Sequence, residues 1–156
     1  MRIKLLAMDV DGTLTDGRIY IGPDGEVMKA FDVKDGYGIV RFRQAGGIPA
    51  IITGRQSKIV EARCRELGIT ELQQGVSDKL SCLMALAEKY NLEREEIAYI
   101  GDDLNDLACM EYAGVSACPC DAVEAVRSSC GYVCSSSGGR GAVREFLDAV
   151  TNREIM

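Results

Sequence analysis

Ile3-Lys4-Leu5-Leu6-Ala7-Met8 is a short apolar run that leads directly into the polar segment Asp9-Val10-Asp11-Gly12-Thr13. A run of this length that ends in turn residues is typical of a strand buried on both faces of a sheet. Further along the chain, similar short runs alternate with segments of helical periodicity. This alternation predicts an α/β fold in which a parallel sheet lies between layers of helices.

The same two patterns predict the remaining elements. Buried strands are expected at Ile48–Ile52, Ile97–Ile100 and Gly114–Ala117, and helices at 39–45, 57–67, 79–90, 104–112 and 142–150. Residues 18–31 differ, because two short strands there flank Gly22-Pro23-Asp24-Gly25, a segment of turn-forming residues. We therefore expect a β-hairpin after the first strand. The length of 156 residues predicts a single domain over 1–156, with a C-terminal tail from about 135 to 156.

Composition excludes several kinds of chemistry. The chain has no histidine, which excludes Ser-His catalysis, Cys-His catalysis and His-ligated zinc, so acid–base steps must use carboxylates or lysine. The formal net charge is −6 and the basic residues are scattered, which argues against nucleic acid or a membrane surface as a partner. The sequence has no membrane-length apolar run and no signal-peptide pattern, so we expect a cytoplasmic protein.

Seven cysteines, an odd number, are spread from Cys64 to Cys134, which favours reduced thiols in a reducing compartment. Four of them lie close together in the sequence: Cys118, Cys120, Cys130 and Cys134. Their spacing matches no standard zinc or iron–sulfur site, so we interpret them as packing residues. A redox or metal protein built on these cysteines is kept as an alternative.

Polar residues gather where three of the predicted strands end. Asp9 and Asp11 follow the first strand, Thr53 follows the strand at 48–52, and Asp102 follows the strand at 97–100. In open α/β sheets, ligands bind beyond the carboxyl ends of the strands, so we expect these side chains to meet. Carboxylates at one point repel one another unless a cation neutralises them, and oxygen ligands favour Mg²⁺. Singly, each acid also fits a turn or a helix start.

Four short motifs occur in order: Asp9-Val10-Asp11-Gly12-Thr13, then Thr53, then Lys79, then Gly101-Asp102-Asp103. Together they resemble the motifs of the haloacid dehalogenase-type phosphatases. The resemblance implies a Rossmann-like, three-layer sheet. The chemistry suits this family, because a metal and Lys79 can cancel the charge that would keep a carboxylate nucleophile away from a phosphate dianion.

The resemblance also implies a role for each motif. Asp9 would be the nucleophile that forms an aspartyl-phosphate, and Asp11 the general acid and then the general base. Mg²⁺ would lie between the Asp9 carboxylate, the Asp11 carbonyl and Asp102. The residues implied to bind the phosphoryl group are Thr53, Gly54, Lys79 and Asn105.

The spacing of the motifs leaves no room for a cap domain. Asp11 and Thr53 are 42 positions apart, which the hairpin and one helix fill, and Thr53 and Lys79 are 26 positions apart, which a helix and a short strand fill. An uncapped site stays wet, which weakens electrostatic catalysis. We therefore expect another part of the assembly to cover it.

Capless relatives often close the site with a neighbouring subunit, and this chain resembles one such group, the 3-deoxy-D-manno-octulosonate 8-phosphate (KDO 8-phosphate) phosphatases. The shared segments are 15–17, 31–39, 53–57, 74–75, 78–79 and 138–145. The resemblance implies a homotetramer with hairpins at its centre and tails that reach a neighbouring site. It implies Mg²⁺-dependent hydrolysis of KDO 8-phosphate, a keto-sugar-acid phosphate, to KDO and phosphate.

Such a substrate carries a second anion, a carboxylate, and Arg55 and Arg63 suit it because guanidinium binds carboxylate in a bidentate fashion. The resemblance places Arg63 at a neighbour's site together with the loop Asp32, Val33, Lys34, Asp35 and Gly36. Arg55 favours the eight-carbon substrate, because relatives that act on nine-carbon sugar acids tend to carry Glu there.

The chain departs from the group at Val40 and Val123, where the family often has Arg and His. Two alternatives therefore stay open beside the cysteine-based one. One is a phosphatase for a nine-carbon sugar-acid 9-phosphate or another small phosphate ester. The other is a non-catalytic binding subunit.

Overall fold

A computed structural model describes residues 2–152 of the chain. Its centre is a six-stranded sheet in the order β5-β4-β1-β6-β7-β8, and all neighbouring strands are parallel. The strands are β1 (Leu5–Met8), β4 (Ile48–Ile52), β5 (Glu71–Gln73), β6 (Ile97–Ile100), β7 (Val115–Cys118) and β8 (Tyr132–Val133). The N-terminal strand β1 therefore lies in the middle of the sheet, where β4 and β6 flank it.

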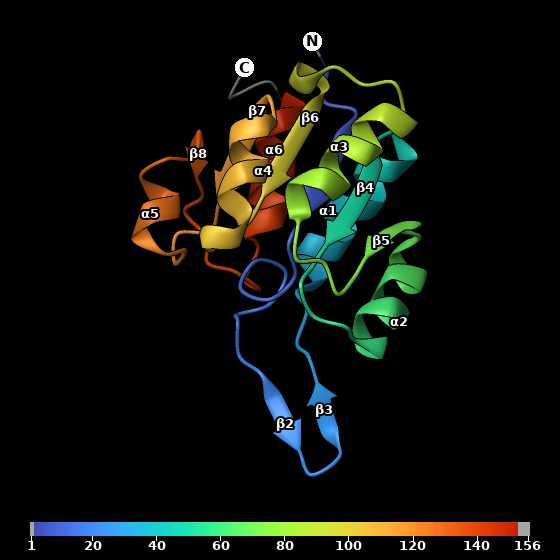
Figure 1. Ribbon diagram of the computed structural model, residues 1–156, viewed down its shortest axis with the longest axis vertical. Helices are drawn as coiled ribbons and strands as arrows, with labels where there is room; N and C mark the ends of the chain where they lie inside the picture. The colour runs from blue at the N-terminus through green and yellow to red at the C-terminus, as the bar shows by residue number, and fades with distance from the viewer. Residues whose placement is uncertain (1, 153–156) are drawn as a thin grey trace.

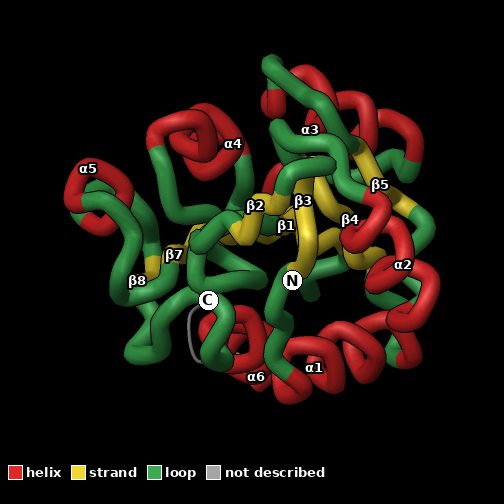
Figure 2. Tube along the Cα trace, turned by 90° about the horizontal axis from the view of Figure 1, so that it is seen from below, coloured by secondary structure: helices red, strands yellow, loops and turns green. Residues whose placement is uncertain are grey.

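Helices cover both faces of the sheet (Figure 2). One face is covered by α1 (Val33–Gln44), α2 (Lys58–Leu67) and α6 (Ala142–Asn152), and the other by α3 (Lys79–Lys89), α4 (Leu107–Tyr112) and α5 (Glu124–Arg127). Short 3₁₀ turns lie at Arg94–Glu96 and Leu104–Asp106. Side chains of β1 alternate between the two cores, with Leu6 and Met8 in one and Leu5 and Ala7 in the other. The predicted three-layer α/β sheet is confirmed.

A β-hairpin forms a separate two-stranded sheet from β2 (Tyr20–Gly22) and β3 (Gly25–Met28). It extends beyond the carboxyl ends of the main strands, at the bottom of Figure 1. Gly25 in the turn has a φ of 113°, a conformation that glycine adopts without strain. As predicted, the hairpin follows the first strand and no cap domain occurs within residues 2–152.

Four elements differ from the sequence prediction: α1, α5, β8 and the helix expected at 104–112, which begins at Leu107 after a 3₁₀ turn. α1 begins six residues earlier than expected, because Asp32 caps it by accepting hydrogen bonds from the N–H groups of Lys34 and Asp35. Its first turns contain two glycines and few apolar residues, so the helical period was not visible there. The short elements α5 and β8 were not predicted, since four and two residues carry no readable period.

Most of the predicted C-terminal tail, as far as residue 152, is part of the core rather than a separate arm, and residues 153–156 lie outside the described residues. Residues 142–152 form α6, whose Val143, Phe146 and Leu147 are buried against the sheet and α1. Among the helices of residues 2–152, none is long and apolar enough to span a membrane.

Candidate active site

The sheet brings the predicted strand-end residues to one edge. Met8 is in register with Ile51 of β4 and with Ile100 of β6, so the residues that follow these three positions leave the sheet at the same level. Asp9, Thr53 and Asp102 come from these three adjacent strand ends. Asp9 and Thr53 are buried, and Asp102 is partly buried.

Three carboxylates meet at this edge, and we call them the acid cluster: Asp9, Asp102 and Asp106. One oxygen from each lies within 4.8 Å of the others, and within residues 2–152 this is the only such grouping of His, Cys, Asp or Glu side chains. The Thr13 hydroxyl donates a 3.1 Å hydrogen bond to Asp102 Oδ1. The cysteines form no comparable group there, although the sulfurs of Cys118 and Cys130 lie 3.2 Å apart.

Gly12 allows the loop at residues 9–13 to approach Asp102. A Cβ at Gly12 would lie 2.0 Å from Asp102 Oδ2, which is far inside van der Waals contact. The φ of Gly12 is 90°, a second reason why another residue would be strained there. The glycine in the first motif therefore has a structural cause.

Lys79 links two members of the acid cluster. It is the first residue of α3, and its Nζ donates hydrogen bonds of 2.9 Å to Asp9 Oδ1 and to Asp106 Oδ1. Burial alone would lower the pKa of Lys79, but the charges of Asp9 and Asp106 outweigh it and raise that pKa. The ammonium is therefore charged and held beside Asp9.

Asp106 was not singled out from the sequence, and its contacts show what it does. Its Oδ1 accepts from Lys79 and, at 2.6 Å, from the hydroxyl of Tyr99, while its Oδ2 accepts from the N–H groups of Asp102 and Asp103. All four acceptor directions of the carboxylate are occupied. Asp106 therefore fixes Lys79 and the loop after β6, and its carboxylate has no acceptor direction left for an ion.

Asn105, expected near Lys79, is exposed on the 3₁₀ turn at 104–106. The turn directs the next residue, Asp106, inward instead. Asp106 is the third acid within the run Gly101 to Asp106, but no local pattern in the sequence marks it as the one that points inward.

The donor chemistry of the site fits Mg²⁺. Burial raises the pKa of Asp102 to about 8, and the neighbouring Asp9 adds to that rise. Burial, and next the charge of Asp106, also raise the pKa of Asp9. A divalent cation would stabilise the ionised form of both carboxylates, and a site made only of oxygen ligands suits Mg²⁺.

The Asp11 side chain does not join the acid cluster. Its Oδ1 accepts a 2.6 Å hydrogen bond from Lys29 Nζ, and its Oδ2 lies 3.9 Å from Nε of Arg55. Both basic residues lie on the hairpin side of the site, one at the end of β3 and the other in the loop after β4. Lys29 was not predicted from the sequence.

The other predicted substrate residues lie along α1 and α2. Arg63 packs over the ring of Phe31 and donates to the Asp32 carbonyl at 3.4 Å and to Glu66 at 3.0 Å. Val33 and Lys34 are exposed. Gly36 is buried where a Cβ would lie 2.4 Å from an Arg63 guanidinium nitrogen. The Arg63 side chain thus makes these contacts outside the acid cluster.

Asp35 is buried between α1 and the start of α6. Its Oδ1 accepts a 2.9 Å hydrogen bond from the N–H of Arg144, whereas its Oδ2 is buried without a hydrogen-bond partner. Burial raises the pKa of Asp35 to about 6. The carboxyl thus connects the first turn of α1 to the C-terminal helix.

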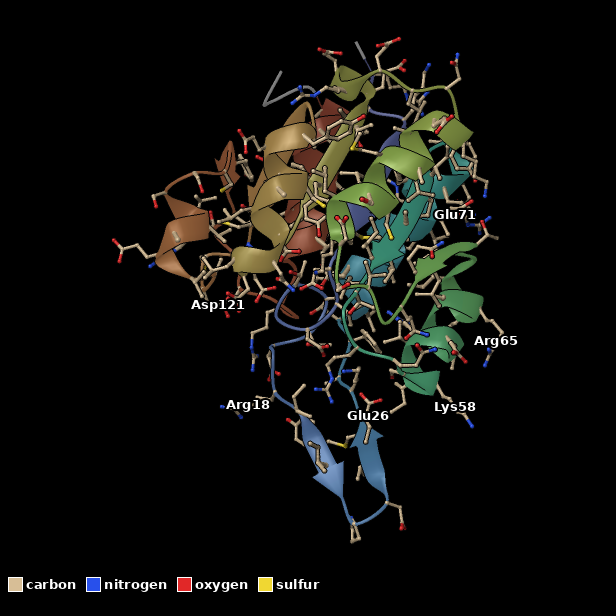
Figure 3. All side chains as sticks on the ribbon, in the orientation of Figure 1. Arg18, Glu26, Lys58, Arg65, Glu71 and Asp121 are labelled. Carbon is tan, nitrogen blue, oxygen red and sulfur yellow. The ribbon has the colours of Figure 1, made fainter. Side chains whose placement is uncertain are left out.

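The glycine-rich segment before α6 lies against the loop at residues 9–13. The N–H of Gly139 donates to the Thr13 carbonyl at 3.1 Å, and a Cβ at Gly138 would lie 1.9 Å from the Gly12 carbonyl oxygen. The N–H of Gly138 also donates to Asp121, which Figure 3 labels, at 2.9 Å. The backbone of this segment therefore forms one wall of the site.

Comparison with known proteins agrees with this geometry. Residues 66–147 match the model of the haloacid dehalogenase-like hydrolase family. The 3-deoxy-D-manno-octulosonate 8-phosphate phosphatase of Escherichia coli strain K12 is 50% identical, over 94% of this chain and 78% of that protein. The corresponding protein of Yersinia pestis is 47% identical, over 95% of this chain and 79% of its own length.

Solved structures show the same fold. The crystal structure of the Yersinia pestis phosphatase superposes with a TM-score of 0.94 at 46% identity, and the match covers 96% of this chain and 81% of that one. The phosphatase of Moraxella catarrhalis, solved in complex with magnesium, phosphate and KDO, gives a TM-score of 0.93 at 45% identity, with 96% and 86% covered. The acid cluster, the capless sheet and these likenesses lead to one conclusion: the chain belongs to the 3-deoxy-D-manno-octulosonate 8-phosphate phosphatase family of the haloacid dehalogenase-like hydrolases.

Proposed function

We propose that this chain is a Mg²⁺-dependent phosphatase that hydrolyses KDO 8-phosphate to KDO and phosphate. The observation that carries the proposal is the buried pair Asp9 and Asp102 beside Lys79, at the carboxyl edge of a capless sheet. The identity of about one half to phosphatases named for this substrate supports the choice of substrate.

Asp9 is the proposed nucleophile. Its Oδ1 is held by Lys79, so its Oδ2 is the oxygen that would attack phosphorus and form the aspartyl-phosphate. The proposed ligands of Mg²⁺ are the carboxylates of Asp9 and Asp102 and the carbonyl of Asp11, and the bound ion would offset the charge of the phosphoryl oxygens. Lys79 adds a fixed positive charge on the same side.

Asp11 is the proposed general acid and base. It would give a proton to the departing alcohol oxygen and later take one from the water that hydrolyses the aspartyl-phosphate. Thr53 and Gly54, at the end of β4, and Lys79 are the proposed phosphoryl contacts. Asn105 is exposed and would contribute only from the rim of the site.

The proposed assembly is a homotetramer. The hairpin exposes apolar side chains to solvent, with Ile21 68% and Val27 61% exposed, and such surfaces are typical of protein contacts. A neighbouring subunit would cover the open site, and Arg63 with residues 32–36 at the start of α1 would serve the neighbour's substrate. The mass in solution, measured by light scattering, should be four times that of one chain.

Arg55 is the proposed contact for the substrate carboxylate. Its side chain is 50% exposed and lies beside Asp11, at the open mouth of the site. This position suits a bidentate contact with the keto-acid end of the sugar. A cytoplasmic setting is also part of the proposal, and the seven unpaired cysteines are compatible with it.

Steady-state phosphate release on eight-carbon and nine-carbon keto-sugar-acid phosphates tests the proposal. We expect higher kcat/KM for the eight-carbon ester, dependence on Mg²⁺, and loss of turnover in Asp9→Asn. A preference for the nine-carbon ester would replace the substrate, and no Mg²⁺-dependent release from any phosphate ester would support a binding subunit. Fluoroberyllate, a phosphate mimic, should add density at Asp9, and density on another residue would refute the mechanism.

A further inference from the structure

Lys29 is a buried lysine on an otherwise exposed hairpin. It follows the last residue of β3, and only 2% of its side chain is exposed. The hairpin residues before it, Val27 and Met28, are exposed. The side chain of Lys29 is therefore enclosed by the protein where the hairpin joins the body.

The ammonium of Lys29 lies between two carboxylates. It donates to Asp11 Oδ1 at 2.6 Å and is paired with Glu26 Oε1 at 2.9 Å. Burial would lower the pKa of Lys29, but the hydrogen bonds to Asp11 and Glu26 outweigh that effect and raise it. A buried ammonium is costly unless it is paired on all sides, so its position is strongly constrained.

Glu26 is itself anchored to the body of the protein. Its Oε2 accepts a 2.6 Å hydrogen bond from the Ser57 hydroxyl, and Ser57 is the N-cap of α2. Figure 3 labels Glu26 on the hairpin. A continuous line of contacts therefore runs from the start of α2 through Glu26 and Lys29 to Asp11.

The two Asp11 oxygens have different surroundings. Lys29 occupies Oδ1, whereas Oδ2 has the Arg55 Nε at 3.9 Å, which is beyond hydrogen-bonding distance. With one oxygen fixed, the carboxyl cannot rotate without breaking a short ion pair. Oδ2 is thus the oxygen left to face a reacting group.

We propose that Lys29 is a positioning residue for the phosphatase reaction, which holds the Asp11 carboxyl from the hairpin so that Oδ2 faces the departing oxygen. This inference rests on the proposed function of Asp11. A simpler role is that Lys29 only anchors the hairpin. The two roles differ in one respect: positioning matters only when the leaving oxygen needs a proton.

Two esters of similar size separate the roles: p-nitrobenzyl phosphate releases an alkyl alcohol, which needs a proton, and p-nitrophenyl phosphate releases a phenolate, which leaves without one. The ratio kcat/KM includes steps only up to departure of the alcohol, and so isolates this proton transfer from later hydrolysis. For Lys29→Met we expect kcat/KM to fall about tenfold or more on the benzyl ester, because general acid catalysis acts on that leaving group. On the phenyl ester we expect a fall of less than about threefold, because its leaving group needs no proton.

Lys4→Met is the matched control, because it removes another ion-paired lysine at the opposite end of β1. It should leave both rates unchanged. Lys29→Arg keeps the charge but shifts its position, so it should lose about threefold on the benzyl ester alone, and it serves if the Met variant does not fold.

Equal losses on the two esters, in either Lys29 variant, would overturn the inference and leave Lys29 as an anchor. Unchanged rates on both esters would overturn it too. If the wild-type chain releases phosphate from neither these esters nor KDO 8-phosphate, it is the proposed function that fails. Wild-type turnover therefore separates the two failures.

Discussion

Replacing Asp35 with Asn should make the protein more stable at neutral pH, by an amount that grows with pH. Asp35 is 1% exposed, and one of its oxygens is buried without a partner. Burial, reinforced by the charge of Asp32, raises its pKa from 3.8 to about 6, although the N–H of Arg144 and the charge of Arg63 oppose this. Between about pH 4 and pH 6, the folded protein therefore keeps a proton on Asp35 that the unfolded chain has already released.

The direction follows from proton binding. Below about pH 4 both states carry the proton, so the carboxyl has no pH-dependent effect there. Between about pH 4 and pH 6 the unfolded chain loses the proton first, so the free energy of unfolding falls as pH rises. Above about pH 6 the full cost is present, and a difference of about two pKa units corresponds to about 3 kcal/mol.

The side-chain amide of the Asp35→Asn variant cannot ionise, so the variant avoids this cost. Part of the gain is lost because a carboxylate at the start of α6 interacts favourably with the helix dipole, by about 0.3 to 1 kcal/mol. We expect a net gain of about 2 kcal/mol at pH 8 and about 1 kcal/mol at pH 5. Urea unfolding of both proteins from pH 5 to pH 8, at one fixed protein concentration, measures it. A variant that is less stable by the same amount at every pH would refute the reasoning.

Three further predictions concern the acid cluster. Gly12→Ala should weaken Mg²⁺ binding and lower kcat about tenfold or more, because the added Cβ would collide with Asp102. Gly46→Ala is the control, since Gly46 has a similar φ and a Cβ there would have no atom within 4 Å, so this variant should be only mildly destabilised. Equal Mg²⁺ affinities of the two variants in calorimetric titrations would contradict this. Tyr99→Phe removes the hydroxyl that donates to Asp106 and should cost about 1 to 2 kcal/mol in the free energy of unfolding; an unchanged melting temperature would show that the bond contributes nothing. Chelation with EDTA should stop phosphate release and added Mg²⁺ should restore it, and activity that persists in EDTA would exclude a metal-dependent reaction.

The sequence was sufficient for the sheet and for the meeting of Asp9 with Asp102. Both residues directly follow buried apolar runs, and the geometry of parallel strands then fixes where they lie. Asp106 was out of reach for a local reason. A 3₁₀ turn at 104–106, rather than a continuous helix, decides which residue of the loop points inward, and apolar periodicity does not report such a turn.

Lys29 was out of reach for a long-range reason. In the sequence it lies in a hairpin, where lysine is normally a solvated residue. Its burial depends on Asp11, 18 positions earlier, and on Glu26, whose own anchor is Ser57, 31 positions later. No local pattern encodes contacts of that kind. The early start of α1 was missed for the simpler reason that its first turns carry few apolar residues.

The close contact of Gly138 with the Gly12 carbonyl also bears on how the enzyme matures during synthesis. The proposed nucleophile precedes nearly all of the sheet in chain order, but the backbone wall beside its loop follows the last strand. A nascent chain that has emerged from the ribosome as far as β7 can pair its central strands, yet its reactive loop still lacks that wall. The backbone that packs against residues 12 and 13 is therefore complete only after Gly138 and Gly139 have been synthesised.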